Sequence, residues 1–232
     1  MTVPGAYAPG SVSTPRPVSI VTDDGHTLEG ELAVADRERC GMVLCHPHPQ
    51  YGGTMRSIVI SALFGALPAV GVTCLRFNFR GVEGSEGFYD EGRGERLDAA
   101  AAVGTLADRL SPATPLVLTG WSFGGDVALS TVVPRLAGWL AVAPPLHFVD
   151  EPPAVAADPR PKLLALAEHD EVRPPAEVEA QVRSWPSTEV VVVDGASHFF
   201  VGRTDRLAEL AQRFVARVAA PGREQPGAGP GA

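Results

Sequence analysis

The chain has 232 residues, 45% of them hydrophobic, which suits one domain with a substantial core. Its 27 acidic residues outnumber its 19 basic ones, the net charge is −8, and the basic residues form no cluster. This balance argues against a protein that binds nucleic acid or an anionic membrane surface. The three cysteines form no CxxC pair and the N-terminal residues show no signal-peptide pattern, so we expect buried free thiols and a cytoplasmic protein.

Both ends of the chain are rich in proline, glycine and small residues. Residues 1–16 and 219–232 offer too little apolar surface to offset the entropy of ordering, so we expect disordered tails around a domain that spans 17–218. The longest apolar stretch is interrupted by Gly65 and Pro68. It is too short to span a membrane and is expected to be a buried helix.

Between these tails, short apolar runs alternate with helical patterns. Strands at 17–22 and 27–34 flank the turn signal DDGH and are predicted to form a hairpin. The segments that follow are predicted to be strand 41–47, helix 55–71, strand 72–79, helix 94–110, strand 115–121, helix 123–133, strands 136–145 and 161–170, helix 174–185, strand 188–195 and helix 198–218. This repeated order of strand and helix indicates parallel strand pairs joined by helices.

The inner strands are almost continuously apolar, which is typical of strands covered on both faces. We therefore predict an α/β fold of the α/β-hydrolase type, with a mostly parallel sheet of about eight strands, helices on both faces and no large cap domain. In such sheets, ligands bind beyond the C-terminal ends of the strands. The residues that follow each strand are thus the candidates for function.

The segment LTGWSFGGDVAL, residues 118–129, places Ser122 between a predicted strand and a predicted helix. A G-x-S-x-G sequence at such a junction is typical of a nucleophile elbow. Gly120 and Gly124 remove side chains that would clash in the tight turn, and Gly125 lets the helix pack closely. We predict that Ser122 projects above the sheet edge, where the helix N-terminus adds a positive dipole end.

A serine needs a base and an orienting acid to act as a nucleophile. His198 follows the last predicted strand, and Asp170 follows the strand before it. The order serine, aspartate, histidine, each just after a strand, predicts a catalytic triad of Ser122, Asp170 and His198.

Four other acidic residues lie near these positions. Glu168 and Glu171 flank Asp170, but Glu168 is expected to lie within the strand. Asp194 precedes His198 by only four residues and suits a turn. Asp126 lies one turn into the helix that follows the serine, and we expect it to be a polar residue of that helix.

The loop CHPHPQYGGTM follows strand residues 41–45 and has two possible roles. His46 and His48 have the H-x-H spacing of metal ligands, but no acidic or cysteine partner lies nearby. Alternatively, the loop supplies one N–H group of an oxyanion hole, and Phe123, the residue after the nucleophile, supplies the other. Because Pro47 and Pro49 lack an N–H group, His48 is the expected donor in this loop.

Five motifs carry a resemblance to a known family: CHPHPQYGGTM, RFNFRGVEGSEGFYDEGRGERLD, GWSFGG, HDEV and ASHFF. Together they resemble the α/β-hydrolase superfamily, and most closely its small lidless bacterial hydrolases related to dienelactone hydrolase and short-chain esterases. The resemblance covers about residues 17–218. The resemblance implies that Ser122 is the nucleophile, Asp170 the acid and His198 the base. It also implies that His48 and Phe123 are the oxyanion donors. One departure is Pro47, because many members carry glycine there.

These motifs predict a serine hydrolase that cleaves a small ester or thioester through an acyl-enzyme, with no cofactor and no metal. An aminopeptidase-like or lactone-opening hydrolase with the same triad is one alternative. A non-catalytic α/β-hydrolase scaffold is another. The expected partner is a small-molecule substrate, and the sequence leaves the oligomeric state open.

The length of one connecting segment bears on substrate size. Segment 146–160 is too short to build a helical cap, so the site is expected to be open to water. Trp121, Phe148 and Phe199 are the candidate walls of a compact pocket, which favours acyl chains from acetate to hexanoate. The charged loop 80–96 is predicted to rim this pocket.

Overall fold

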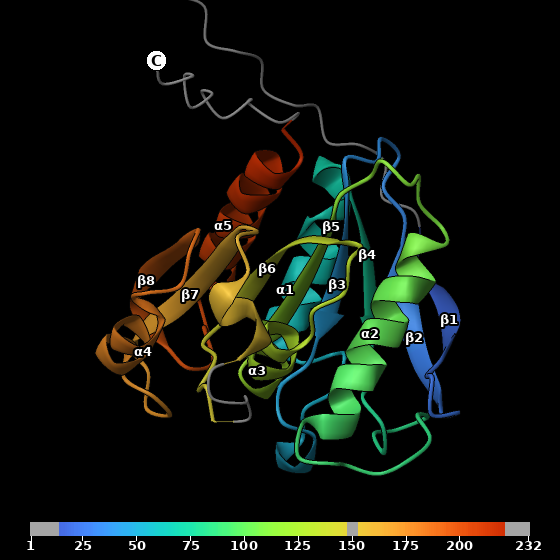
Figure 1. Ribbon diagram of the computed structural model, residues 1–232, viewed down its shortest axis with the longest axis horizontal. Coiled ribbons are helices and arrows are strands. Elements are labelled where there is room, and N and C mark those ends of the chain that lie inside the picture. Colours follow the sequence, from blue (N-terminus) through green and yellow to red (C-terminus); the bar gives the residue numbers. More distant parts are fainter. Residues whose placement is uncertain (1–13, 148–152, 221–232) are drawn as a thin grey trace, which may run out of the picture.

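A single sheet with helices on both faces forms the body of the protein (Figure 1). The computed structural model describes residues 14–147 and 153–220, and the following elements lie within them. The strands are β1 (Arg16–Val21), β2 (Thr27–Ala33), β3 (Cys40–Cys45), β4 (Val72–Phe77), β5 (Leu116–Trp121), β6 (Leu136–Val142), β7 (Lys162–His169) and β8 (Thr188–Ser197). The helices are α1 (Ile58–Ala66), α2 (Arg93–Ala107), α3 (Phe123–Ser130), α4 (Pro175–Val182) and α5 (Thr204–Val218), with short 3₁₀ helices at Pro49–Tyr51, Pro68–Val70 and Ala154–Ala157.

The strand order in the sheet is β1-β2-β4-β3-β5-β6-β7-β8. Strand β2 is antiparallel to both its neighbours, whereas every pair from β4 to β8 is parallel. All residues of β3 and of β5 are buried, as expected of central strands that are covered on both faces. The predicted α/β fold with a mostly parallel sheet is therefore confirmed, and the described part of the chain contains no large cap domain.

Two clusters of buried apolar side chains hold the helices against the sheet. One cluster includes residues of α2, α3 and α4, and the other includes residues of α1 and α5. Figure 1 shows α2 in front of the sheet and α1 behind it. Burial of one large apolar side chain contributes about 1.5–3 kcal/mol, so each cluster holds its helices firmly against one face of the sheet.

Helix α5 begins later than the sequence pattern predicts. The prediction of a helix over 198–218 was wrong at its start, because α5 begins at Thr204. Phe200 and Gly202 have φ angles of 51° and 72°, which are incompatible with a right-handed α-helix. The residues after β8 therefore form a turn, and this turn carries His198.

Helix α1 is also shorter than the predicted helix 55–71. It ends before Pro68, which begins a 3₁₀ turn because proline cannot continue the α-helical hydrogen bonding. Throughout residues 14–147 and 153–220, no helix has both the length and the apolar composition needed to cross a bilayer. The expected tails lie almost wholly outside the described residues.

The three cysteines are buried free thiols in β3 and β4. Burial raises the pKa of the Cys40 thiol to about 12 and raises the pKa values of Cys45 and Cys74 further. Because the thiolate is the reactive form of cysteine, these side chains pack as small apolar groups and offer no nucleophile.

A lysine at the start of β7 is fully buried. The Nζ atom of Lys162 donates to the carbonyl oxygens of Asp158 (2.5 Å) and Arg160 (2.8 Å). It also lies 5.8 Å from a ring centre of Trp139. Burial lowers the pKa of Lys162, and the two carbonyl groups compensate by accepting from its ammonium group. This side chain therefore fastens the turn that enters β7.

Candidate active site

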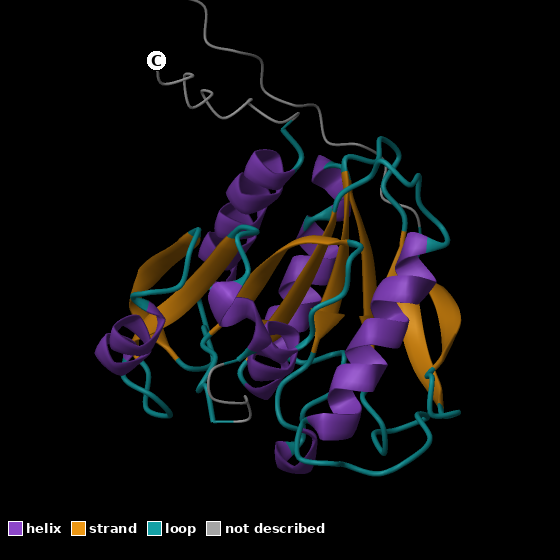
Figure 2. Ribbon diagram, in the orientation of Figure 1, coloured by secondary structure: helices purple, strands orange, loops and turns teal. Residues whose placement is uncertain are grey.

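Ser122 occupies the sharp turn between β5 and α3, after the C-terminal end of β5. The loops that join strands to helices are teal in Figure 2. Its φ of 54° lies in the left-handed region, which is strained for a residue other than glycine. A Cβ atom on Gly120 would overlap the carbonyl group of Gly124. A Cβ atom on Gly124 would overlap the carbonyl oxygens of Cys45 and His46. The glycines therefore let α3 approach β3 and β5 closely and fix the position of the serine.

The structure brings together the three side chains of the predicted triad. His198 Nε2 lies 2.9 Å from Ser122 Oγ, and His198 Nδ1 lies 3.0 Å from each carboxylate oxygen of Asp170. The side chains of His198 and Asp170 are almost fully buried, so their interaction is weakly screened. Because an ionised carboxylate only accepts hydrogen bonds, Nδ1 carries the imidazole proton. Nε2 is then left to accept the hydroxyl proton of Ser122.

The loop after β7 orients Asp170. Its Oδ1 atom accepts hydrogen bonds from the backbone N–H groups of Val172 (2.9 Å) and Arg173 (3.1 Å). These bonds hold the carboxylate in place, and such preorganisation lowers the reorganisation needed when the histidine becomes charged.

The alternative acids have other partners. Glu168 lies in β7, as predicted, and its carboxylate accepts from the backbone N–H of Gly195 at 2.7 Å. Glu171 accepts from the backbone N–H of His198 at 3.3 Å, not from its ring. Asp194 lies in β8, so its prediction as a turn residue was wrong; the strand continues to Ser197. Among the described residues, Asp170 is the acid whose carboxylate contacts the imidazole.

Trp121 lines the cavity, as the sequence predicts, and it also binds the backbone of His198. Its indole Nε1 donates to the backbone carbonyl of His198 at 3.1 Å. Together with Glu171 on the backbone N–H, this bond clamps the peptide groups on both sides of the histidine. The sequence carried no signal for this clamp, because Trp121 and His198 are brought together only by the parallel sheet.

His46, at the end of β3, is a buried neutral histidine. Its Nδ1 lies 2.6 Å from the carbonyl oxygen of Pro47, and its Nε2 lies 3.0 Å from the backbone nitrogen of Phe79. Since a backbone N–H only donates, Nε2 accepts and Nδ1 carries the proton. Burial lowers the pKa of His46 to about 4. The ring therefore ties the loop after β3 to the residues after β4.

His48 is surrounded by aromatic rings. Its Nδ1 accepts from the backbone N–H of Gln50 at 3.2 Å, and its Nε2 lies 3.1 Å from Tyr89 Oη. The ring centres of Tyr51, Tyr89 and Phe123 lie 4.6 Å, 4.9 Å and 5.0 Å from that of His48. Burial lowers the pKa of His48. Loop 80–96 thus reaches the site through Tyr89, a contact that the sequence analysis missed.

The two histidine rings use their nitrogen atoms on different partners and do not converge on a common point. Within the described residues, no group of three or more His, Cys, Asp or Glu side chains is arranged to hold a metal ion. The H-x-H spacing is therefore explained by loop structure, with one ring buried and the other facing the site.

An open cavity of about 560 Å³ lies beside Ser122. Its lining consists of Pro47, His48, Tyr51, Gly52, Gly53, Ser57, Ile58, Trp121, Ser122, Phe123, Pro145, His147, Val172, His198 and Phe199. Two of the three predicted pocket residues, Trp121 and Phe199, are in this lining, and Phe148 lies outside the described residues. The two predicted oxyanion donors, His48 and Phe123, also line the cavity.

Asp126 holds one side of this cavity. It is fully buried in α3, and its carboxylate accepts from the backbone N–H groups of Leu146 (2.8 Å) and His147 (2.9 Å). The sequence predicted a polar helix residue, and the structure adds that this residue fixes the segment after β6.

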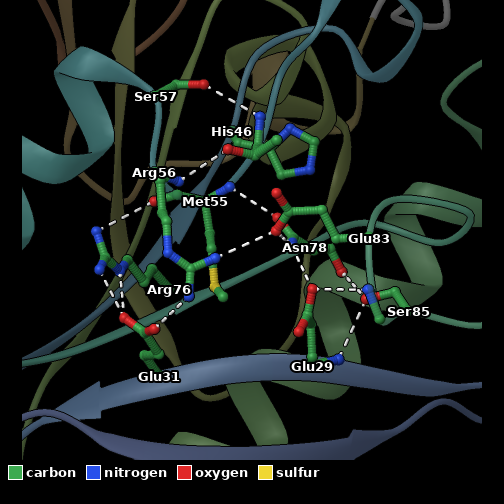
Figure 3. Close-up of polar contacts among 12 residues, drawn as sticks. Glu29, Glu31, His46, Met55, Arg56, Ser57, Arg76, Asn78, Glu83 and Ser85 are labelled. Atoms are coloured by element: carbon green, nitrogen blue, oxygen red, sulfur yellow. Dashed lines mark hydrogen bonds and ion pairs between the residues drawn. The ribbon is translucent and has the colours of Figure 1, made fainter.

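A polar network supports the loop that precedes α1 (Figure 3). Asn78 Oδ1 accepts from the backbone N–H of Met55 at 2.7 Å, and Asn78 Nδ2 donates to Glu83 at 2.7 Å. Arg56 pairs with Glu31 at 2.7 Å and with Glu83 at 3.2 Å. The network thereby anchors this loop, which supplies one wall of the cavity, to β2 and to the residues after β4.

The charged loop 80–96 is fastened by buried polar groups. Arg80 is almost completely buried and pairs with Asp98 at 2.7 Å and with Asp24 at 2.9 Å. The buried carboxylate of Glu95 accepts from two backbone N–H groups of the same loop, at 2.9 Å and 2.8 Å. These charges therefore act mainly on the loop itself, and its Tyr89 contacts the site.

Comparisons with known proteins cover most of the chain. No family model matches it. It is 30% identical over 202 residues to "Uncharacterized protein RP471" of Rickettsia prowazekii (strain Madrid E), across 82% of this chain and 85% of that protein. A solved alpha-beta serine hydrolase homologue from Coxiella burnetii is 34% identical, with a TM-score of 0.77 over 86% of this chain and 96% of that chain. XC6422 from Xanthomonas campestris, described as an a/b serine hydrolase without lid, is 25% identical, with a TM-score of 0.77. The match covers 90% of this chain and 97% of that chain.

Proposed function

Because the chain belongs to the α/β-hydrolase family, in its small lidless group, we propose that it hydrolyses a small ester or thioester through an acyl-enzyme on Ser122. One observation carries this proposal. Ser122 Oγ lies 2.9 Å from a histidine nitrogen whose ring is oriented by a buried carboxylate. That is the arrangement needed to activate a serine hydroxyl at neutral pH.

In the first half of the reaction, Ser122 Oγ attacks the carbonyl carbon while His198 Nε2 takes the hydroxyl proton. Asp170 stabilises the imidazolium ion that forms. The tetrahedral intermediate then collapses, the bond to the leaving group breaks, and the leaving oxygen or sulfur takes the proton from Nε2. The acyl group remains on Ser122.

Backbone N–H groups of His48 and Phe123 are the proposed donors to the negatively charged oxygen of the intermediate. Phe123 is the first residue of α3, so its N–H belongs to the positive end of the helix beside Ser122. His48 lines the same cavity, and its aromatic neighbours hold its loop. A preorganised donor of this kind contributes about 10²–10³ in kcat.

In the second half of the reaction, His198 Nε2 takes a proton from water, and the resulting hydroxide equivalent attacks the acyl carbon. A second tetrahedral intermediate collapses to release the carboxylic acid and to return the proton to Ser122 Oγ. No cofactor enters these steps.

The open cavity supports small substrates. Each buried methylene adds about 0.8 kcal/mol of binding only while a wall is present to cover it. We therefore propose that kcat/KM for p-nitrophenyl esters is highest between acetate and hexanoate and falls for longer chains. We also propose a cytoplasmic setting, since the buried thiols and the absence of a CxxC pair suit a reducing compartment.

A fluorophosphonate probe and an ester series test the proposal. The parent protein is expected to be labelled at Ser122 and to hydrolyse p-nitrophenyl butyrate, and Ser122→Ala is expected to lose labelling and at least about 10⁴ in kcat. Ser57→Ala is the matched control, because Ser57 lines the same cavity. A parent protein that neither reacts with the probe nor cleaves esters, thioesters, lactones or amides would instead be a non-catalytic scaffold.

A further inference from the structure

Among the residues that the structure describes, no permanently charged side chain lines the cavity beside Ser122. Its lining combines apolar and aromatic residues with glycines, two serines and three histidines, and includes no Lys, Arg, Asp or Glu among the described residues. A carboxylate entering this cavity would lose part of its hydration without gaining a cationic partner.

Apolar side chains are exposed on both sides of the nucleophile. Tyr51 and Ile58, from the loop before α1 and the first turn of α1, are 87% and 42% exposed. Val172 and Phe199, from the loops after β7 and β8, are 47% and 51% exposed. All four line the cavity. Exposed apolar surface of this kind gains free energy when a bound molecule covers it.

The arginines nearest to this lining in sequence are directed to other partners. Arg56 pairs with Glu31 and Glu83 in the network of Figure 3. Arg173 donates from Nη1 to the carbonyl oxygen of Pro145 and from Nη2 to Gln181 at 2.9 Å. Its buried Nε atom makes no hydrogen bond and lies 3.6 Å from Glu177 Oε2. Neither guanidinium group is part of the cavity lining.

Two negatively charged side chains contact His198. Asp170 contacts the His198 ring, and Glu171 contacts the His198 backbone N–H. The whole chain also carries a net charge of −8. Long-range attraction therefore does not assist an anionic acyl group, and local repulsion disfavours it.

From these observations we infer the substrate class: esters or thioesters whose acyl group is uncharged and apolar, to the exclusion of acyl groups that carry a free carboxylate, such as half-esters of dicarboxylic acids or carboxylated lactones. This inference rests on the proposed serine hydrolase function. It adds that the cavity walls select against charge, and that Ile58 and Val172 are specificity-determining positions.

Three p-nitrophenyl esters of six-carbon acyl groups test this selection at pH 8. These are the hexanoate, the adipate half-ester with a free carboxylate, and the methyl ester of that adipate, which keeps the oxygen atoms without the charge. We expect kcat/KM for the half-ester to be about 100-fold lower than for the other two. Equal values for the half-ester and its methyl ester would overturn the inference.

Arginine substitutions locate the origin of the selection. Ile58→Arg and Val172→Arg each place a cation at an exposed position of the cavity wall. Each is expected to lower the ratio of kcat/KM for the methyl ester to kcat/KM for the half-ester about tenfold or more. Val201→Arg is the matched control, because Val201 is 71% exposed, lies two residues beyond Phe199 and is outside the lining. For Val201→Arg, the ratio of kcat/KM between the methyl ester and the half-ester is expected to stay within about threefold of the parent value. Circular dichroism checks that all three variants are folded.

The outcomes separate this inference from the proposed function. If the parent enzyme cleaves the hexanoate but Ile58→Arg and Val172→Arg change the preference no more than Val201→Arg does, the cavity walls do not select and the inference fails alone. If the parent cleaves none of the esters and Ser122 resists the fluorophosphonate, the proposed function fails and the inference fails with it.

Discussion

Replacing Asp170 with asparagine removes the charge of this residue while keeping its shape. Oδ1 of Asp170 accepts from the backbone N–H groups of Val172 and Arg173, and Oδ2 lies 3.0 Å from His198 Nδ1. Asparagine keeps the two loop bonds only when its oxygen occupies the Oδ1 position. Its NH₂ group then lies at the Oδ2 position, 3.0 Å from His198 Nδ1, and competes with the oxygen at the Oδ1 position, also 3.0 Å away, so that the tautomer with Nδ1 as acceptor is favoured.

The imidazole proton consequently moves to Nε2, the atom that lies 2.9 Å from Ser122 Oγ. A protonated Nε2 donates to the serine and no longer takes its proton. We expect kcat to fall by about 10⁴, which corresponds to about 5.4 kcal/mol at about 1.36 kcal/mol per tenfold. KM is expected to change by less than about threefold, because Asp170 is not part of the cavity lining.

Steady-state kinetics with p-nitrophenyl butyrate give kcat and KM, and far-UV circular dichroism with urea unfolding confirms that the variant is folded. Glu171→Gln and Asp194→Asn serve as controls. Glu171 bonds only the backbone N–H of His198, and Asp194 lies in β8 without contact to its ring, so both variants are expected to retain kcat within about tenfold.

Either of two results would show that Asp170 does not orient His198. One is an Asp170→Asn variant that retains kcat within tenfold of the parent. The other is a greater loss for Asp194→Asn or Glu171→Gln than for Asp170→Asn, which would assign the orienting acid elsewhere.

Three further changes test other parts of the structure. Gly124→Ala would push a methyl group into the carbonyl oxygen of His46 and should lower the free energy of unfolding, measured in urea, by about 3 kcal/mol. Gly104→Ala, which has open space around the added methyl group, should raise the free energy of unfolding by about 0.5–1 kcal/mol. Equal effects of the two substitutions would contradict the close approach of α3. The pKa of His46 is about 4 in the folded protein and about 6.5 in the unfolded chain. The unfolded chain therefore binds a proton at a higher pH than the folded protein does. The stability that the neutral His46 ring contributes is present above pH 6.5 and is lost as the pH falls toward 4. Urea titrations from pH 8 to 4 should show this loss, and His46→Gln should reduce it; an unchanged pH dependence would count against a neutral buried ring. Tyr89→Phe removes the partner of His48 Nε2 and should lower kcat about tenfold at unchanged KM, whereas full activity would show that the pair does not position the oxyanion loop.

Much of the fold was readable from the sequence, because local patterns encode it. Continuous apolar runs identified the buried parallel strands, and glycines around Ser122 identified a turn in which larger residues do not fit. The family assignment and the mostly parallel sheet were confirmed. The positions of Asp170 and His198, each just beyond a strand, follow from strand periodicity, and their proximity follows from the common direction of parallel strands.

The features that sequence reasoning missed depend on tertiary contacts or on backbone geometry. Tyr89 and His48 are separated by 41 residues and meet only after loop 80–96 folds onto the sheet. Asp126 fixes a loop 20 residues away, and nothing local distinguishes it from an exposed helix residue. The late start of α5 depends on the left-handed conformation of Phe200, a residue type for which such backbone angles are rare.

The buried lysine at the start of β7 makes the protein unusual in its reactivity toward amine reagents. Lys162 is the sole lysine of the chain, and its ammonium group is enclosed by two carbonyl groups and an indole ring. Reagents that acylate lysine, including those that attach proteins to beads or fluorophores, reach this nitrogen only when the turn before β7 opens. The rate at which Lys162 is acylated, followed by mass spectrometry, therefore measures local opening of the turn that enters β7, at the opposite end of this strand from Asp170.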